Sequence, residues 1–199
     1  MLLSSVHLTR WRARIPAKRP GVLWIAGLLG ALPLVAVQAA PACEQAVSMV
    51  FTESAPRDRF EIRNDSSSGQ RIQRLTLDLS GSAGRLIFDT VAGGTGVNVF
   101  QPFRVESGEA RLSGTAVVQD GSERLELAFS RFGPGQRLVF SIDVDDRLTA
   151  SDLGQTRVSG AEMAGALLTV VIGPRGGDSR EVRARVDGEN RAQVRTRCS

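Results

Sequence analysis

The sequence predicts an exported all-β protein, an antiparallel β-sandwich or jelly roll preceded by a signal peptide. Three observations lead to this prediction. The chain of 199 residues begins with a basic and then strongly apolar segment. Beyond that segment, apolar and polar residues alternate with a period of two, as they do in half-buried strands. Turns that are rich in glycine or contain Asp-Gly separate these runs, which is typical of sandwiches and jelly rolls.

Residues 1–42 have the organisation of a secretory signal peptide. Five cations between residues 10 and 19 precede an apolar run over 22–37, and the small-residue stretch 39–42 follows. We therefore expect export to the periplasm or the extracellular space, with cleavage after Ala39 or Ala42. The apolar run is shorter than the roughly 20 residues of a membrane span, and an uncleaved anchor is the alternative that the sequence leaves open.

The leader also accounts for the positive charge of the whole chain. The net charge is +4, but all 21 acidic residues follow the leader, where only 20 of the 25 cations remain. Residues 43–199 thus carry a net charge of −1, and we expect no nucleic-acid partner. This segment also contains no His, Lys, Tyr or Trp. Because the usual general base and the Schiff-base lysine are missing, we expect no enzymatic activity.

The alternating pattern predicts strands along most of residues 43–199. In residues 137–144 the even positions are apolar and the odd positions, apart from Val139, are polar. The other predicted strands are residues 43–51, 58–63, 74–79, 85–89, 97–105, 123–129, 166–172, 180–186 and 191–197. Residues 159–168 are the best candidate for a helical turn. No internal repeat or long linker divides this segment, and we expect residues 43–199 to form one domain.

Cys43 and Cys198 are the only cysteines and lie at the two ends of that domain. An even pair in an exported protein predicts a disulfide. Strand parity supports the pairing, since it places both sulfur atoms on the core side of their strands. The alternative is a lipid-modified Cys43, because residues 40–43 loosely resemble a lipoprotein box. Membrane attachment is then expected only through the leader or this lipid.

The densest acidic group comprises Asp143, Asp145, Asp146 and Asp152. Strand parity places Asp143 and Asp145 on the solvent face at the end of a strand. One interpretation is a solvated acidic strand end that faces Arg147 and Arg157. The other is a structural calcium site, because Ca²⁺ takes 6–8 oxygen ligands and accepts carboxylates together with loop carbonyls. The spacing lacks the Gly and Glu positions of an EF-hand loop.

A second candidate site consists of Arg183, Arg185, Arg195 and Arg197. If the last two predicted strands pair through a turn at Asp187-Gly188, all four guanidinium groups share one outward face. Such groups bind carboxylate, sulfate or phosphate in a two-point manner, which suggests a weak site for acidic polysaccharide or lipopolysaccharide. The alternative is an ordinary exposed face that Glu181 and Glu189 balance.

The glycine-rich run at residues 93–96 follows a predicted strand, as a phosphate-binding loop would. It lacks the lysine and the following helix that such a loop needs, and we interpret it as a flexible turn. We interpret the eight phenylalanines mainly as core residues, since a sugar-binding face typically uses Trp or Tyr.

Four segments resemble a family of secreted bacterial proteins that are described as similar to the core protein of sponge aggregation factor. The segments are LIFD (86–89), VFQPF (99–103), FSIDVDD (140–146) and VSGAE (158–162). The resemblance covers residues 47–172 and implies extracellular cohesion, calcium and glycans, with no catalytic residue.

From these observations we expect a secreted or cell-surface interaction or adhesion module without enzymatic activity. Calcium would stabilise it, and its partner would be an acidic extracellular glycan or an envelope or surface protein. One alternative is a periplasmic structural accessory or chaperone-like domain that binds an envelope protein through an exposed sheet edge. The weakest alternative is a hydrolase that uses a carboxylate pair.

Overall fold

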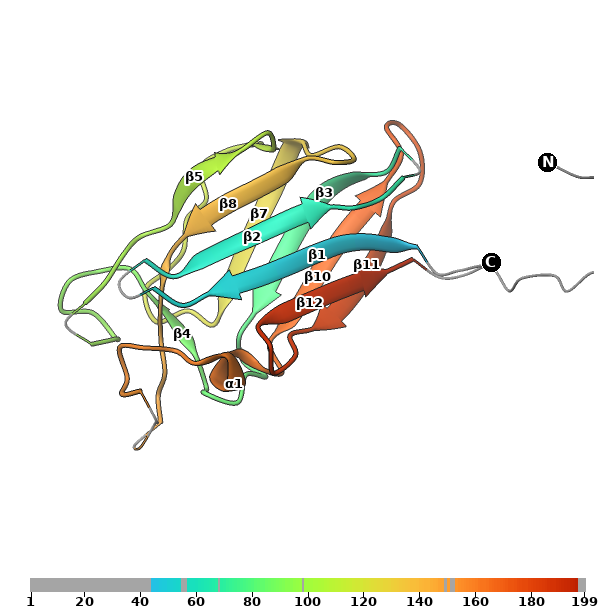
Figure 1. The fold of residues 1–199 in the computed structure, drawn as a ribbon. Coiled ribbons are helices and arrows are strands. Elements are labelled where there is room, and N and C mark those ends of the chain that lie inside the picture. Colours follow the sequence, from blue (N-terminus) through green and yellow to red (C-terminus); the bar gives the residue numbers. More distant parts are fainter. Residues whose placement is uncertain are drawn as a thin grey trace, which may run out of the picture. The chain divides into compact units, whose positions relative to one another are not determined.

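The computed structural model describes residues 44–196, except residues 55–56, 68, 98, 149 and 151–152. Two five-stranded antiparallel sheets pack against each other (Figure 1), which confirms the predicted all-β sandwich. The expected signal peptide, both cysteines, Asp152 and Arg197 lie outside the described residues.

The first sheet has the strand order β12-β1-β2-β8-β5. Its members are β1 (Gln45–Thr52), β2 (Arg59–Asn64), β5 (Arg104–Gly108), β8 (Arg137–Ser141) and β12 (Arg191–Arg195). All neighbouring strands in this sheet are antiparallel. Next to the last residue of β12, the Thr196 N–H donates to the carbonyl of Glu44, which precedes β1 (2.9 Å). The two ends of the described chain therefore lie together.

The second sheet has the strand order β11-β10-β3-β7-β6. Its members are β3 (Arg71–Asp78), β6 (Arg111–Leu112), β7 (Arg124–Arg131), β10 (Leu167–Gly173) and β11 (Arg180–Arg185). A separate antiparallel pair, β4 (Ile87–Asp89) with β9 (Asp143–Asp145), lies at one end of the sandwich (Figure 1).

The core forms between the inner faces of the two sheets, as the alternation predicts. In β7, for example, Leu125, Leu127 and Phe129 are buried, while Arg124 and Glu126 are exposed. Phenylalanines of the first sheet form a continuous row, because ring centroids are 5.0 Å apart for Phe51–Phe60 and for Phe60–Phe140. Phe100 departs from the expected core role, with 40% of its surface exposed.

The strand predicted over residues 137–144 is interrupted in the structure. It divides at Ile142, whose N–H donates to the Asp58 carbonyl (3.0 Å). Before this point β8 pairs with β2 and β5, and after it β9 pairs with β4. The chain thus leaves the first sheet here, which the uninterrupted alternation of side chains does not reveal.

Residues 97–105 were expected to form one strand, but β5 begins only at Arg104. The preceding residues form a loop, and the backbone of Gln101 bonds to β4 and β9 instead of to the first sheet. The Gln101 N–H donates to the Asp89 carbonyl (3.2 Å), and the Gln101 carbonyl accepts from the Asp143 N–H (3.1 Å). This loop therefore packs on the β4–β9 pair.

The helical turn expected in residues 159–168 is the four-residue α1 (Gly160–Met163). A capping box begins it, since Ser159 and Glu162 exchange backbone and side-chain hydrogen bonds. The strand β10 follows from Leu167, so the helix is shorter than the predicted range. In the described part of the chain, no helix has the length and hydropathy needed to cross a membrane.

Candidate metal centre

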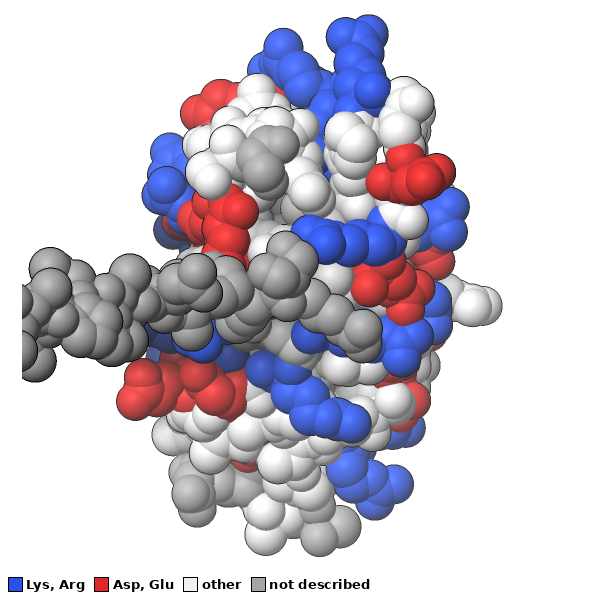
Figure 2. All heavy atoms as spheres, turned by 90° about the vertical axis from the view of Figure 1, so that its right-hand side faces the viewer, with Lys and Arg blue, Asp and Glu red and all other residues white. Residues whose placement is uncertain are grey.

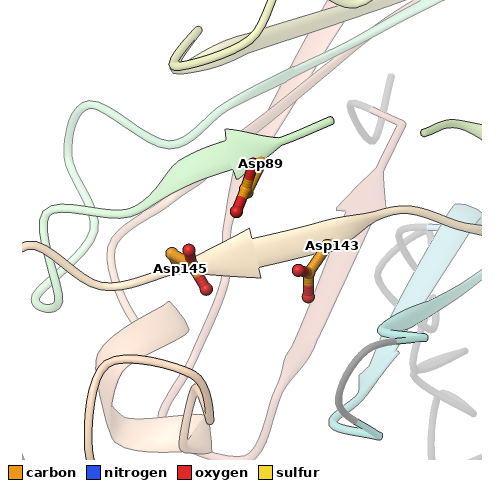
Figure 3. Close-up of side chains that lie close together, drawn as sticks. All are labelled: Asp89, Asp143 and Asp145. Carbon is orange, nitrogen blue, oxygen red and sulfur yellow. The ribbon is translucent and has the colours of Figure 1, made fainter. Parts of the chain in front are cut away.

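Three aspartates meet on the β4–β9 pair (Figure 3). Asp89 ends β4, and Asp143 and Asp145 begin and end β9. In the register of this pair, Asp89 lies opposite Asp143, and Ile87 lies opposite Asp145. One carboxylate oxygen from each aspartate lies within 4.8 Å of the others. We refer to Asp89, Asp143 and Asp145 as the aspartate triad.

The triad is buried, which makes its charge costly. Asp89 and Asp143 are 0% exposed and Asp145 is 1% exposed. Both side-chain oxygens of Asp89 and of Asp143, and Oδ1 of Asp145, have no hydrogen-bond partner. Each buried polar group left unsatisfied costs about 1–3 kcal/mol, and a charged group costs more. No ion pair of the described residues includes a member of the triad.

Burial and mutual repulsion make these carboxyl groups poor acids when no cation is bound. Burial, followed by the charge of Asp145, raises the pKa of Asp89 to about 7 and that of Asp143 to about 8. Burial also raises the pKa of Asp145. A bound cation would remove the cause of both effects, because it favours the charged form of every carboxyl group around it.

Asp58 lies in the connection between β1 and β2 and is hydrogen-bonded to β9, which carries two residues of the triad. Its carboxylate accepts hydrogen bonds from the Val144 N–H (3.1 Å) and the Ser54 N–H (3.0 Å). Burial nevertheless raises the pKa of Asp58 to about 7. The bond to Val144 holds the middle residue of β9, and it thereby positions the two triad residues on either side.

The glycine-rich loop at residues 93–96 covers the triad. The Val97 N–H donates to Asp145 Oδ2 (2.7 Å). A Cβ atom added to Gly96 would lie 2.3 Å from a carboxylate oxygen of Asp89 and 2.3 Å from one of Asp145. Only glycine allows the backbone to approach two carboxylates this closely. The expected flexible turn is thus a loop that packs against the triad.

Asp120 holds the start of the same loop. Its carboxylate accepts hydrogen bonds from the backbone N–H groups of Thr90 (2.8 Å), Val91 (3.2 Å) and Thr95 (2.7 Å). The bonds from Thr90 and Thr95 lower the pKa of Asp120 to about 2. Asp120 lies beside Asp89 and adds to its negative surroundings. It remains charged and well hydrogen-bonded, which suits a residue that orients the loop.

The structure brings together part of the acidic group that the sequence predicts. Asp143 and Asp145 lie in the triad, and Asp146 follows with Oδ1 bonded to the Leu148 N–H (2.8 Å) and Oδ2 buried without a partner. The expectation that Asp143 and Asp145 face solvent is wrong. After Ile142 the chain has left the first sheet, so the parity of that sheet no longer tells which side chains face solvent. The loop that contains Gln101 packs on Asp143 and Asp145, and both are buried. Asp152 lies outside the described residues.

Sequence reasoning missed Asp89 because its partner in the site is distant along the chain. One signal was present. Asp89 ends the LIFD segment, and Asp143 and Asp145 belong to the FSIDVDD segment. Two apolar segments that both end in aspartate were candidates for pairing.

The arginine face expected at the C-terminus rests on a strand pairing that does not occur. β11 pairs with β10 and β12 pairs with β1, so the two strands belong to different sheets. Arg183 and Arg185 do share one exposed face, but Arg195 lies on the other sheet, and Arg197 is outside the described residues. Arg183 bonds to Glu181 through Nε (2.8 Å). Basic and acidic side chains are interspersed on the face shown in Figure 2. Anion binding by these arginines stays a prediction.

No family model, no curated protein and no solved structure matches the chain. The aspartate triad is a buried group of oxygen donors that could hold a metal ion.

Proposed function

We propose that the protein is an exported interaction module without enzymatic activity, and that the aspartate triad binds a structural Ca²⁺ ion. One observation carries the metal assignment: five carboxylate oxygens of the triad are buried with no hydrogen-bond partner. A divalent cation is the simplest partner for such a group, because it neutralises the repulsion and satisfies several oxygens at once.

The donor chemistry favours calcium over other metals. The triad offers only carboxylate oxygens, whereas zinc and copper sites in proteins use mainly imidazole or thiolate ligands. Mg²⁺ binds few protein ligands and keeps several waters, which a buried cluster does not readily accommodate. A carboxylate can ligate Ca²⁺ through one or both of its oxygens. Extracellular modules bind it with dissociation constants of about 10⁻⁴ to 10⁻³ M.

A structural role follows from what the triad connects. Its residues belong to β4 and β9, and the loop over residues 90–97 packs on it through Gly96 and Val97. Calcium bound there would fasten this end of the sandwich. Catalysis by the same carboxylates is disfavoured, because side chains that are 0–1% exposed cannot contact a glycosidic bond.

Calorimetric titration with CaCl₂ after EDTA treatment tests the metal assignment. We expect one Ca²⁺ per chain and a melting temperature that rises with Ca²⁺ concentration. Asp89→Asn should abolish the heat of binding, whereas Asp178→Asn, which changes an exposed acid in another turn, should preserve it. A wild-type protein that gives no binding heat at millimolar Ca²⁺ would refute the assignment.

The interaction role has a separate test. The resemblance of residues 47–172 to proteins linked with extracellular cohesion supports an adhesive role. We expect the calcium-loaded protein to bind acidic glycans on an array and to lose this binding in EDTA. Absence of binding to every glycan, in a protein that does bind calcium, would remove the adhesion part alone.

A further inference from the structure

Strand β7 is paired along only part of one edge. On one side, β3 pairs with Arg124–Ala128 of β7. On the other side, β6 covers only Phe129 and Arg131. The Ser113 N–H then donates to the Ala128 carbonyl (2.8 Å), and beyond this bond the described chain adds no strand to this edge. The stretch from Arg124 to Leu127 is therefore an open sheet edge.

The direction of the backbone groups follows from that last bond. In a strand, the N–H and C=O of one residue point to the same side, and those of the next residue point to the other side. Because the Ala128 carbonyl points away from β3, the N–H and C=O of Glu126 point the same way. Those of Arg124 do as well, and Ser122 Oγ occupies both of them (3.0 Å each). Glu126 is left as the accessible backbone position in the middle of the edge.

A groove of about 420 Å³ runs along this edge. Residues 112–116 line one wall, and residues 126–128 line the other. Ala116 and Val118 pack against the core and so hold residues 116–118 on the sandwich. The backbone of these residues does not pair with β7. Val117 lies between Ala116 and Val118 with 87% of its surface exposed. The groove thus places the free N–H and C=O of Glu126 opposite residues 112–116, where an added strand could bond to them.

We propose that the β7 edge is a docking site for an extended segment of a partner polypeptide, which adds to the sheet as an antiparallel strand. Strand addition of this kind derives affinity from main-chain hydrogen bonds and specificity from alternate side chains. Inward side chains of the segment would lie next to Leu127 and Ala116 and are therefore small or apolar. Outward side chains would lie beside Glu126 and its ion-pair partners Arg74 and Arg124.

Charge complementarity defines one end of the partner segment. Arg111 donates to the Gly108 and Ala110 carbonyls, and Arg131 donates to the Glu109 carbonyl. Arg71 donates to the Ser130 carbonyl nearby. None of these three guanidinium groups forms an ion pair with a carboxylate of the described residues. An antiparallel segment enters at this end with its N-terminus, and we expect acidic residues there.

The probe is a synthetic acetylated peptide with two aspartates followed by alternating valine and threonine. The reversed peptide, with the aspartates at its C-terminal end, is its matched control. Amide hydrogen exchange measures the position of binding. In the free protein the Glu126 amide should exchange rapidly and the Leu125 and Leu127 amides, which point to β3, slowly. The forward peptide should protect Glu126 at least tenfold, and the reversed peptide should protect it less.

Two substitutions of Glu126 distinguish peptide binding through its backbone N–H from binding through its side chain. Glu126→Pro removes the outward N–H and should weaken peptide binding at least tenfold, whereas Glu126→Ala retains the N–H and should bind within about threefold of wild type. If Glu126→Pro does not fold, the exchange data on the wild type decide the question.

Three results would overturn the proposal. The first is strong protection of the Glu126 amide in the dilute free protein, which would mean that residues 115–119 already pair with β7. The second is protection that depends on protein concentration without peptide, which would identify a second copy as the occupant. The third is absence of protection with either peptide. Calcium binding is tested separately and would be unaffected by any of these results.

Discussion

Asp89 and Asp143 lie directly opposite each other across the antiparallel β4–β9 pair. Like charges in this arrangement destabilise a strand pair, and here both side chains are fully buried without a hydrogen-bond partner. The pairing is therefore stable only if the carboxyl groups are protonated or share a cation.

Asp143→Asn should change stability in opposite directions with and without calcium. In EDTA at pH 8 the amide removes a buried charge, so the variant should be more stable than wild type by about 1–3 kcal/mol. In excess Ca²⁺ the wild type gains about 2.7 kcal/mol at 100 times its dissociation constant, and the variant gains little. Urea unfolding in both buffers measures the two differences. If the same protein were the more stable one in both buffers, the result would contradict a metal centre at the triad.

The calcium-free protein should lose stability as the pH rises from about 4 to about 8. The pKa values of Asp58, Asp89 and Asp143 in the folded state, about 7, 7 and 8, lie above the ordinary value of 3.8. In this range the folded protein binds more protons than the unfolded chain, so the free energy of unfolding falls with rising pH. The stabilisation is complete below pH 3.8 and is lost as the pH passes through the raised pKa values.

Calcium should reverse this dependence, because Ca²⁺ and protons compete for the same carboxylates. Melting temperatures at pH 5 and pH 8.5, in EDTA and in Ca²⁺, test it. We expect the stabilisation by Ca²⁺ to be larger at pH 8.5. A stabilisation that is equal at both pH values would show that the buried carboxyl groups do not bind the ion.

Gly96→Ala should weaken both calcium binding and the fold. The added methyl group would lie 2.3 Å from carboxylate oxygens of Asp89 and Asp145, so the loop must move away from the triad. We expect at least a tenfold loss of Ca²⁺ affinity and a destabilisation of about 1–3 kcal/mol. Gly114→Ala is the matched control, since its methyl group meets no atom within 4 Å. Calorimetric titration of both variants measures the effect, and similar affinities would argue against close packing of the loop on the ion.

The two cysteines should form a disulfide in an oxidising compartment. They lie outside the described residues, but Glu44, which follows Cys43, and Thr196, which lies two residues before Cys198, are hydrogen-bonded to each other. A crosslink between the two ends closes nearly the whole domain, for which the chain-entropy model gives about 4–5 kcal/mol. Intact mass after processing should be two hydrogen masses below the reduced chain, and reduction should lower the melting temperature. A mass increased by a diacylglyceryl group would instead identify a lipid-modified Cys43.

The strands and the core could be predicted from the sequence because they depend on local alternation. Leu125, Leu127 and Phe129 are buried and Arg124 and Glu126 are exposed, as a period of two requires. The change of partner at Ile142 could not be predicted in this way. The alternation continues through that residue, whereas the new partner strand, β4, lies far away in the chain.

The sequence by itself determined that the chain forms an all-β sandwich and that Asp143, Asp145 and Asp146 are concentrated in one segment. Only the tertiary structure decided that all three of these residues are buried, that Asp89 joins Asp143 and Asp145, and that Gly96 packs on Asp89 and Asp145. The physical reason is that burial and proximity arise from pairing between distant strands, here β4 with β9. The alternation of residues determines which side of a strand faces inward, but it does not determine which other strand lies beside it.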